Sequence, residues 1–532
     1  MTGTVVERAP EPPAFAPLGQ SGFRWLWPAV VVSYVGIWSQ TVGAQWLLVN
    51  GPNANVTVAL IQTAVMLPMM LFSLPAGVLA DRYDRRWIMI AIQLYAAVVS
   101  LLLAWLTAAG LATPPVVLLF TLLLGLAGAF MQPAWQATLP EVVPRDQLGA
   151  ATRLEMVGMN FGRSVGPALA GIVIGLSGVP WVFLITVATS LVLVVALLTW
   201  RRPAPTEPPR TRERFLPALN AGIRYVRNDR VVRRILLRSV LFIAPATVLW
   251  ALIPIVARER LDIDAGAYGA LFGALGVGAV IAALSVGKLR RTVSINGLLV
   301  GAGLVYAIVL AVIVLVPVFA VALVALVVGG AAWTTCISIL NAEMQVVLPT
   351  WVRARGLAVY LVTFTGSQAV ASLLWGQVAA LTGIVVVFVA GAVLVAGAAL
   401  SGFFLRIPEV AGSDQETSTY LGDVNVPVEL QPTDGPILVT VDYTVLPENE
   451  AEFLASTAAL RRSRLRSGAS RWELYRVAET PDRFVETFQV ASWEEHLAQH
   501  RERLTQADQR IEETTRSYIA GVGNVRHLIP PD

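Results

Sequence analysis

The stretch Gly77-Val78-Leu79-Ala80-Asp81-Arg82-Tyr83-Asp84-Arg85-Arg86 places five charged residues within six positions. The 56 residues from Trp25 to Ala80 contain no Asp, Glu, Lys or Arg, and neither do residues 87–140 on the other side. A hydrocarbon layer about 30 Å thick needs about 20 apolar helical residues for each crossing. A charge cluster between two such uncharged runs therefore predicts a short loop at a membrane surface, on the side that retains basic residues.

The composition agrees with a polytopic membrane protein. Hydrophobic residues make up 56% of the 532 residues, charged residues make up 14%, and the mean hydropathy is +0.66. The net charge of +4 comes almost wholly from arginine and does not indicate nucleic-acid binding. Cys336 is the single cysteine, and all three histidines follow residue 495, so disulfides and a histidine relay within the membrane are excluded. We expect no cofactor.

Apolar runs predict twelve membrane-spanning helices. The first six are 27–48, 56–80, 87–109, 115–137, 153–176 and 181–200, and the second six are 235–256, 265–287, 294–315, 318–340, 356–381 and 384–405. Arginine is concentrated in the loops on the side of Asp81, which predicts that this side and both termini are cytoplasmic. We expect residues 1–23 to be a disordered tail, because they are Pro-rich and lack the pattern of a secretory signal.

The two sets of six helices look like repeats of one another. At a shift of 205 positions, residues 171–178 align with residues 376–383, and residues 142–144 align with 347–349. The sequence thus predicts two six-helix bundles, at 24–200 and 235–406, joined by a basic loop at 201–234. Within that loop, residues 215–226 have the spacing of an amphipathic helix lying on the membrane.

A polar linker at 407–436 leads to a small domain at 437–532. Its pattern predicts a strand at 437–445, a helix after Pro447, and a hairpin of strands 472–478 and 483–490. Ser492 and Glu495 form a capping box that is expected to open one long helix, followed by a last strand at 525–529. This βαββαβ order predicts a ferredoxin-like α+β domain.

The opening charge cluster resembles the signature loop of the major facilitator superfamily, Gly-x-Leu-Ala-Asp-Arg-x-Gly-Arg-Arg, with Asp84 where that family has Gly. The resemblance implies the all-α major facilitator fold and transport by alternating access. It also implies that the cluster is a latch that holds the two halves together in one state; the alternative is that the arginines only fix orientation. The latch residues are Gly77, Asp81, Arg82, Arg85 and Arg86.

A second motif lies in the fifth predicted helix and comprises Gly158, Gly162, Gly166, Pro167 and Gly171. Small residues four positions apart let helices approach closely, and proline can bend a helix. The run is similar to the antiporter signature of drug-exporting facilitators, and the resemblance implies export in exchange for protons. The alternative is a packing stripe of the kind found in any polytopic protein.

Arg163 lies within this motif, about ten residues or ~15 Å into its helix. A charge near the bilayer centre costs roughly 3 kcal/mol or more unless it is paired or hydrated. Arg163 could bind an anionic group of the substrate or set the protonation of a carboxylate. It could equally be a structural partner of Glu155 or of a carbonyl freed by Pro167. No carboxylate lies mid-helix, so Glu155 is the best candidate for proton coupling.

Polar and aromatic residues on the first, fourth, seventh and tenth helices suggest a cavity for an amphipathic molecule, because those helices line the central cavity in the superfamily. Each residue alone is more often a packing or interfacial residue. The cavity candidates are Trp38, Gln40, Gln132, Gln136, Trp250 and Trp333.

In the small domain, His496 and His500 have the i, i+4 spacing of a metal pair. No further ligand is fixed by the sequence, so we favour a structural role and assign neither a metal nor catalytic residues. The Trp-Glu-Leu-Tyr strand and the Trp-Glu-Glu-His-x3-His helix resemble the dimeric α/β-barrel domains related to antibiotic-biosynthesis monooxygenases. That resemblance implies a possible homodimer through this domain.

The complete layout resembles the bacterial transmembrane secretion effectors, which include siderophore and drug exporters. The resemblance implies a multi-pass transporter of the cytoplasmic membrane, not an enzyme, with lipid, a small amphipathic substrate and protons as partners. Two alternatives stay open from the sequence. One is a membrane-tethered monooxygenase-like enzyme, and the other is a sensor or assembly protein that acts through the C-terminal domain.

Overall fold

The computed structural model describes residues 13–200, 215–408, 412–418, 420, 426–428 and 430–530, without the side chains of Asp81, residues 215–219 and Val522. The expectation of disorder at residues 1–12 lies outside this range. The chain divides into two compact units. The first comprises residues 1–210, 238–339 and 361–405, and the second comprises residues 211–237, 340–360 and 406–532.

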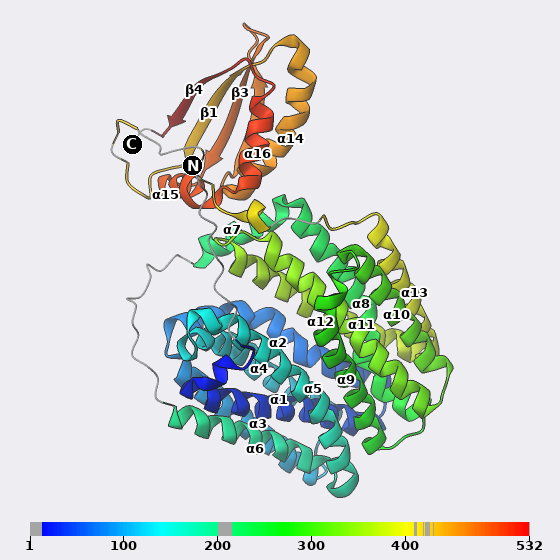
Figure 1. Ribbon diagram of the computed structural model, residues 1–532. Coiled ribbons are helices and arrows are strands. Elements are labelled where there is room, and N and C mark those ends of the chain that lie inside the picture. The colour runs from blue at the N-terminus through cyan, green and yellow to red at the C-terminus, as the bar shows by residue number, and fades with distance from the viewer. Residues whose placement is uncertain are drawn as a thin grey trace. The chain divides into compact units, whose positions relative to one another are not determined.

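Long helices make up the first unit and extend into the second (Figure 1). The first set is α1 Ser21–Leu48, α2 Ala54–Arg82, α3 Arg85–Ala108, α4 Pro114–Val142, α5 Leu148–Ser177 and α6 Val179–Thr199. The second set is α8 Arg230–Glu259, α9 Ala265–Leu289, α10 Ile295–Leu315, α11 Phe319–Val347, α12 Arg353–Thr382 and α13 Ile384–Leu400. Every helix predicted from an apolar run is present, with ends that differ by a few residues.

Eleven of the described helices are long and apolar enough to cross a bilayer. The first helix, α1, is not among them although it is 28 residues long. Its polar residues Ser39, Gln40 and Gln45 are buried and lower its hydropathy without facing the outside. The first span is therefore recognisable by length and position more than by apolarity.

Backbone geometry repeats between the two sets. Gly178 connects α5 to α6 with φ +93°, and Gly383, 205 positions later, connects α12 to α13 with φ +87°. Glycine adopts this left-handed conformation without the penalty that a Cβ would bring. The same sharp turn therefore connects the last two helices of each set.

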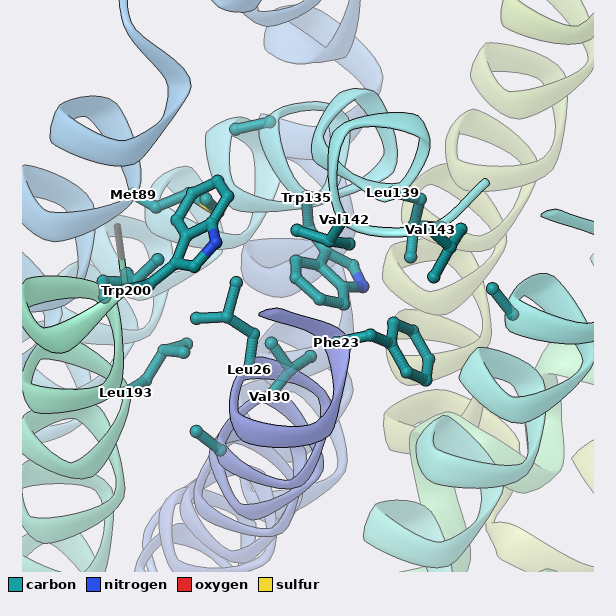
Figure 2. Close-up of a cluster of buried hydrophobic side chains, with 14 of the residues drawn as sticks. Phe23, Leu26, Val30, Met89, Trp135, Leu139, Val142, Val143, Leu193 and Trp200 are labelled. Atoms are coloured by element: carbon teal, nitrogen blue, oxygen red, sulfur yellow. The ribbon is translucent and has the colours of Figure 1, made fainter. Parts of the chain in front are cut away.

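The core of the first set lies between α1, α3, α4 and α6. Phe23 and Leu26 of α1 are fully buried against Trp135 of α4 and Met89 of α3, and Trp200 follows α6 at the edge of this cluster (Figure 2). Close packing of such large side chains fixes the relative positions of the helices. The apolar surfaces that face lipid cannot do so, because lipid solvates them equally well in any arrangement of the helices.

The C-terminal domain, in the second unit, is an antiparallel sheet with helices on one face (Figure 1). Its elements are β1 Ile437–Thr444, α14 Glu450–Ser467, β2 Arg471–Arg476, β3 Arg483–Val490, α15 Trp493–Ala498, α16 Gln506–Arg516 and β4 Gly521–Leu528. The strand order β2-β3-β1-β4 and the βαββαβ sequence confirm the predicted ferredoxin-like domain. Alternate residues of β1, from Ile437 to Tyr443, are buried against the helices.

One long helix after Ser492 was predicted, and this prediction is wrong. Ser492 does cap α15 by accepting from the Glu495 N–H at 3.3 Å, but α15 is six residues long. A single wide turn, Gln499–Arg503, follows it, and Thr505 then opens α16 with a complete capping box to Asp508. The second cap satisfies the first free N–H groups of a new helix, which allows the chain to break there.

The loop between the two sets contains α7, Phe215–Asn228, as predicted. Its apolar side chains Tyr225 and Val226 are 2% and 7% exposed, and the Tyr225 ring lies edge-on to Trp351 at 5.8 Å. Protein covers this face of α7, whereas the sequence had suggested that lipid would.

Short helical turns complete the chain. They are Ala16–Gly19, Arg145–Gln147, Ser401–Phe403, Gly412–Gln415 and Pro447–Asn449.

Candidate transport site

The charged loop joins α2 to α3, and its arginines bind the ends of neighbouring helices. Arg85 donates to the carbonyls of Ala80 at 3.0 Å and Ala137 at 2.6 Å, and it pairs with Glu141 at 2.7 Å. The last carbonyls of a helix have no partner within the helix, so a cation at this position is favourable. Sequence reasoning missed Glu141, although it is the first charge after the long uncharged run.

Arg86 makes the same kind of contact with α6, because its Nε and Nη2 donate to the carbonyls of Leu197 and Leu198 at 2.7 and 2.8 Å. Asp84 caps α3 by accepting from the Arg86 N–H at 2.9 Å. This cap explains how the turn is built without the glycine that the superfamily has at this position. These contacts lie within the first set of helices; the side chain of Asp81 is outside the described residues, and the latch remains a prediction.

The glycines of the second motif form a stripe along α5 that faces α1. A Cβ on Gly162 would lie 2.5 Å from the Cβ of Tyr34, and one on Gly166 would lie 2.7 Å from the Val35 carbonyl oxygen. Side-chain atoms do not fit at such distances, so the glycines allow the α5 backbone to approach α1 this closely. The Ser39 hydroxyl donates to the Gly166 carbonyl at 2.8 Å and fixes the register.

Farther along, α5 meets α9 of the other half. A Cβ on Gly171 would lie 2.5 Å from the Ala265 carbonyl oxygen, and one on Gly269 would lie 2.5 Å from the Pro167 carbonyl oxygen. We call this contact the α5–α9 seam, defined by residues 164–171 and 265–276. The predicted motif therefore has two partners, one within its own half and one across the molecule.

The contacts that join the two halves share one end of the bundle. We call the end that carries residues 82–85 the loop end, and the opposite end the far end. At the far end, Gln62 of α2 donates to Gln368 of α12 at 3.0 Å, and Arg258 donates to Asn50 at 3.1 Å. The α5–α9 seam also lies beyond the midpoint of α5.

The loop end is different. A Cβ placed on Gly77 of α2 or on Gly287 of α9 would meet no atom within 4 Å. Both glycines lie in the last turns of their helices, next to charged loops of the two halves. Among the described residues, the halves thus pack closely at the far end while these two positions at the loop end face open space.

Between these ends, Arg163 of α5 faces α8. Its Cζ lies 5.8 Å from the centroid of the Trp250 ring, and its Nη2 donates to Asn160. The buried Nε has no hydrogen-bond partner among the described residues. The sequence alternative of a structural pair with Glu155 is not observed, because Glu155 is buried and accepts from the Tyr34 hydroxyl instead.

Aromatic rings surround Trp250. Its ring centroid lies 6.2 Å from that of Trp38 in α1, 5.6 Å from Trp333 in α11 and 6.0 Å from Phe272 in α9. Three of the cavity candidates, Trp38, Trp250 and Trp333, are therefore brought together. Tyr268 and Gln45 complete one side of the group, with a hydrogen bond of 2.8 Å from the tyrosine hydroxyl to the amide oxygen.

The glutamine candidates lie elsewhere. Gln40 accepts from Ser100 at 3.4 Å and lines a cavity of about 120 Å³ inside the first set, together with Gln93 and Thr121. Gln132 is half-buried and Gln136 is exposed on α4. Periodicity alone could not separate these glutamines from the tryptophans, because it gives the face of a helix but not the helix that covers it.

In the C-terminal domain, the three histidines lie together. The ring of His496 is fully buried, 4.7 Å from the centroid of His500 and 4.9 Å from that of His527. Burial, followed by the charges of His500 and His527, lowers the pKa of His496 to about 3. Among the described residues, no group of three His, Cys, Asp or Glu side chains is arranged to hold a metal ion.

A buried ion network crosses the same domain. Arg464 pairs with Glu486 at 3.2 Å and with Glu512 at 2.9 Å, and all three side chains are less than a tenth exposed. Burial would raise the pKa of Glu512, but the charges of Arg464 and Arg516 lower it below its ordinary value. This network lies beside the apolar core between the sheet and its helices, since the Arg464 guanidinium is 5.2 Å from the Phe488 ring.

Comparison with known sequences decides the family. The description of transmembrane secretion effectors matches residues 12–530. The chain belongs to this family. Its relatives are transporters and not enzymes, which removes support for the membrane-tethered enzyme that the sequence had left as an alternative.

Among curated proteins, the staphyloferrin A transporter of Staphylococcus aureus is 24% identical over 48% of this chain and 64% of its own length. The putative multidrug resistance protein MdtD of Yersinia pestis is 32% identical over 25% of this chain and 27% of its own length. The chain thus matches less than two thirds of either relative.

Solved structures share the fold. A bacterial homologue of the human lysosomal transporter Spinster, in an inward-facing and unoccupied conformation, superposes with a TM-score of 0.57 at 13% identity over 72% of this chain and 97% of that one. The nucleoside transporter NupG gives a TM-score of 0.55 at 12% identity, over 72% and 99%. These matches and the helix layout confirm the predicted major facilitator fold.

Proposed function

We propose that this secretion effector exports a small amphipathic molecule across the cytoplasmic membrane in exchange for protons, by alternating access. The proposal rests on two matched helix sets that contact each other at the far end and enclose a central aromatic group with a partly buried cation, Arg163. The siderophore and multidrug transporters among its relatives support this class of substrate.

The direction follows from orientation. The predicted excess of arginine on the loop end assigns that end to the cytoplasm, with both termini on the same side. The close contacts between the halves at the far end support our assignment of this structure to a state open to the cytoplasm. An exporter takes up its substrate in this state.

Glu155 is our candidate for the proton site. It is 3% exposed, and one of its oxygens accepts from Tyr34 while the other has no hydrogen-bond partner among the described residues. A carboxyl group in such a place can take up and release a proton as α1 and α5 move. The Tyr34 hydroxyl couples this event to α1, which also carries Trp38 of the aromatic group.

Proteoliposomes with an imposed pH gradient test this function. We expect purified protein to move a dansylated amphipathic probe when the pH gradient is present, and we expect transport to stop when an uncoupler removes the gradient. Transport that continues unchanged without the gradient would refute proton exchange. A failure to move any amphipathic probe, by protein that is folded and correctly inserted, would refute the transport proposal itself.

For the C-terminal domain we propose a regulatory role, with dimerisation remaining a prediction. Arg466 of α14 pairs with Asp229 at 3.0 Å, and Asp229 caps α8 by accepting from the N–H groups of Val231 and Val232 at 2.9 Å. Arg466 also pairs with Asp508 at 2.6 Å. The domain therefore binds the first turn of a helix that continues into the membrane part.

A second contact links the domain to α7 and to the turn before α12. Glu495 pairs with Arg224 of α7 at 3.4 Å and with Arg503, whose guanidinium lies 5.1 Å from the Trp351 ring. Substituting Arg466→Gln should change the transport rate while leaving membrane insertion intact. Arg510→Gln, an exposed change in the same domain, should leave the transport rate unchanged. Equal rates in both variants would remove the regulatory proposal.

A further inference from the structure

Arg163 is a cation without a counter-ion in the part of the chain that the structure describes. Of its five N–H donors, one is used by Asn160, and its face lies over Trp250 at 5.8 Å. No Asp or Glu pairs with it among the described residues. A charged side chain at this depth of a bilayer is expensive unless an opposite charge or water compensates it.

The nearest acidic residue on the same helix does not serve. Glu155 precedes Arg163 by eight positions, or ~12 Å along the helix axis, and its hydrogen bond is with Tyr34 on α1. Among the described residues, Arg163 therefore pairs neither with Glu155 nor with a carbonyl freed by Pro167, the two structural partners that the sequence had suggested. Its unused N–H donors are available to an anionic ligand.

The surroundings define the rest of such a ligand. Trp38, Trp250 and Trp333 come from α1, α8 and α11, so both halves contribute rings to the group around Trp250, on which the guanidinium lies. Flat aromatic surfaces favour an apolar or ring-containing body. The planar guanidinium fork matches the two oxygens of a carboxylate or phosphate group, which lysine would not do.

We propose that Arg163 and Trp250 form the substrate-recognition site, and that the substrates are amphipathic organic anions whose carboxylate or phosphate pairs with Arg163 while an apolar body lies on the tryptophans. This proposal rests on the transport function proposed above. The guanidinium lies on Trp250 at 5.8 Å, and a bound anion would replace this weaker contact with an ion pair. The substrate would thereby supply a counter-ion to the partly buried arginine.

The test uses dansylglycine and its methyl ester, which differ by one negative charge. The full chain in lipid nanodiscs is titrated with each probe, and energy transfer from tryptophan to the dansyl group reports binding. We expect the wild-type protein to prefer the acid over the ester, and Arg163→Gln to lose about tenfold to a hundredfold of its affinity for the acid, as for other charged hydrogen bonds. Affinity for the ester should change little.

Arg153→Gln is the matched control, because Arg153 lies on the same helix but is exposed near the loop end. It should retain the preference for the acid. Arg163→Lys keeps the charge without the fork and provides a second measurement if the glutamine variant fails to fold. We expect it to lose part of the affinity for the acid and none for the ester.

Two results would overturn the inference: equal affinity of the wild-type protein for acid and ester, or an unchanged preference in the Arg163 variants. Neither result would contradict the transport proposal, provided that the protein binds the ester and transports it in proteoliposomes. If no probe is moved at all, while the acid is still bound with the expected preference, transport fails and anion recognition stands.

Discussion

Gly171→Ala offers a sharp test of alternating access. The added Cβ would lie 2.5 Å from the Ala265 carbonyl oxygen, 3.1 Å from the Gly269 Cα and 3.2 Å from the Gly266 Cα. All three are backbone atoms, which cannot turn aside as the end of a flexible side chain could. The α5–α9 seam must therefore widen to admit one methyl group.

The magnitude follows from overpacking. Forcing one extra methyl group into a close contact costs about 1–3 kcal/mol. The cost is incurred only in the state with the seam closed, so the equilibrium shifts toward the state open at the far end by about fivefold to 150-fold. Gly175→Ala is the matched control, because no atom lies within 4 Å of its Cβ position on the same helix.

The assay measures access to the far end. In a Cys336→Ser background, which removes the single native thiol, Gln62→Cys places a reporter at a contact between α2 and α12 that is 7% exposed. We expect Gly171→Ala to raise the rate of labelling by a water-soluble thiol reagent by the factor above, and Gly175→Ala to leave it unchanged. Equal labelling in the two variants would show that the seam does not control access.

Three further predictions concern stability. Arg85→Gln removes contacts to two backbone carbonyls near helix ends and to one carboxylate, so it should lower the free energy of unfolding by about 1.5–3 kcal/mol. The control Arg82→Gln should change it by less than ~0.5 kcal/mol. Thermal unfolding in detergent measures both variants, and equal losses would contradict the assignment. Arg464→Met leaves the Glu486 carboxylate buried without its counter-ion, with only the hydrogen bonds from Tyr443 and Trp472, and should cost about 3–5 kcal/mol, seen as faster hydrogen exchange in α14 and β3. Unchanged exchange would show that the network is unimportant. An unfolded histidine takes up a proton near pH 6.5, whereas His496 in the folded domain takes one up only near its pKa of about 3. Between these two pH values the unfolded state binds more protons, so the free energy of unfolding should fall on acidification by up to ~1.4 kcal/mol per pH unit. His496→Phe should flatten this slope between pH 6.5 and 5, where most carboxylates are still ionised, and a slope equal to that of the wild type would refute the assignment.

The sequence determined much of this protein by itself. Hydropathy gave the number and order of the helices, because crossing a bilayer imposes a length and an apolarity that no neighbour can replace. The charge pattern of residues 81–86 and the glycines of residues 158–171 located two motifs whose residues make contacts between helices. The period-2 pattern of β1 and its neighbours gave the ferredoxin-like domain.

The tertiary structure decided which of these residues meet. It brought Trp38 and Trp333 together around Trp250, which lies against Arg163, and it placed Gln40 in a small cavity within one half. In the structure Glu155 accepts a hydrogen bond from Tyr34 and does not pair with Arg163. The apolar face of α7 packs against protein, including Trp351. Contacts between helices depend on side-chain shape and on partners that are distant in the chain. The periodicity of a sequence shows only on which face of its helix a residue lies, so it cannot show which helix packs against that face.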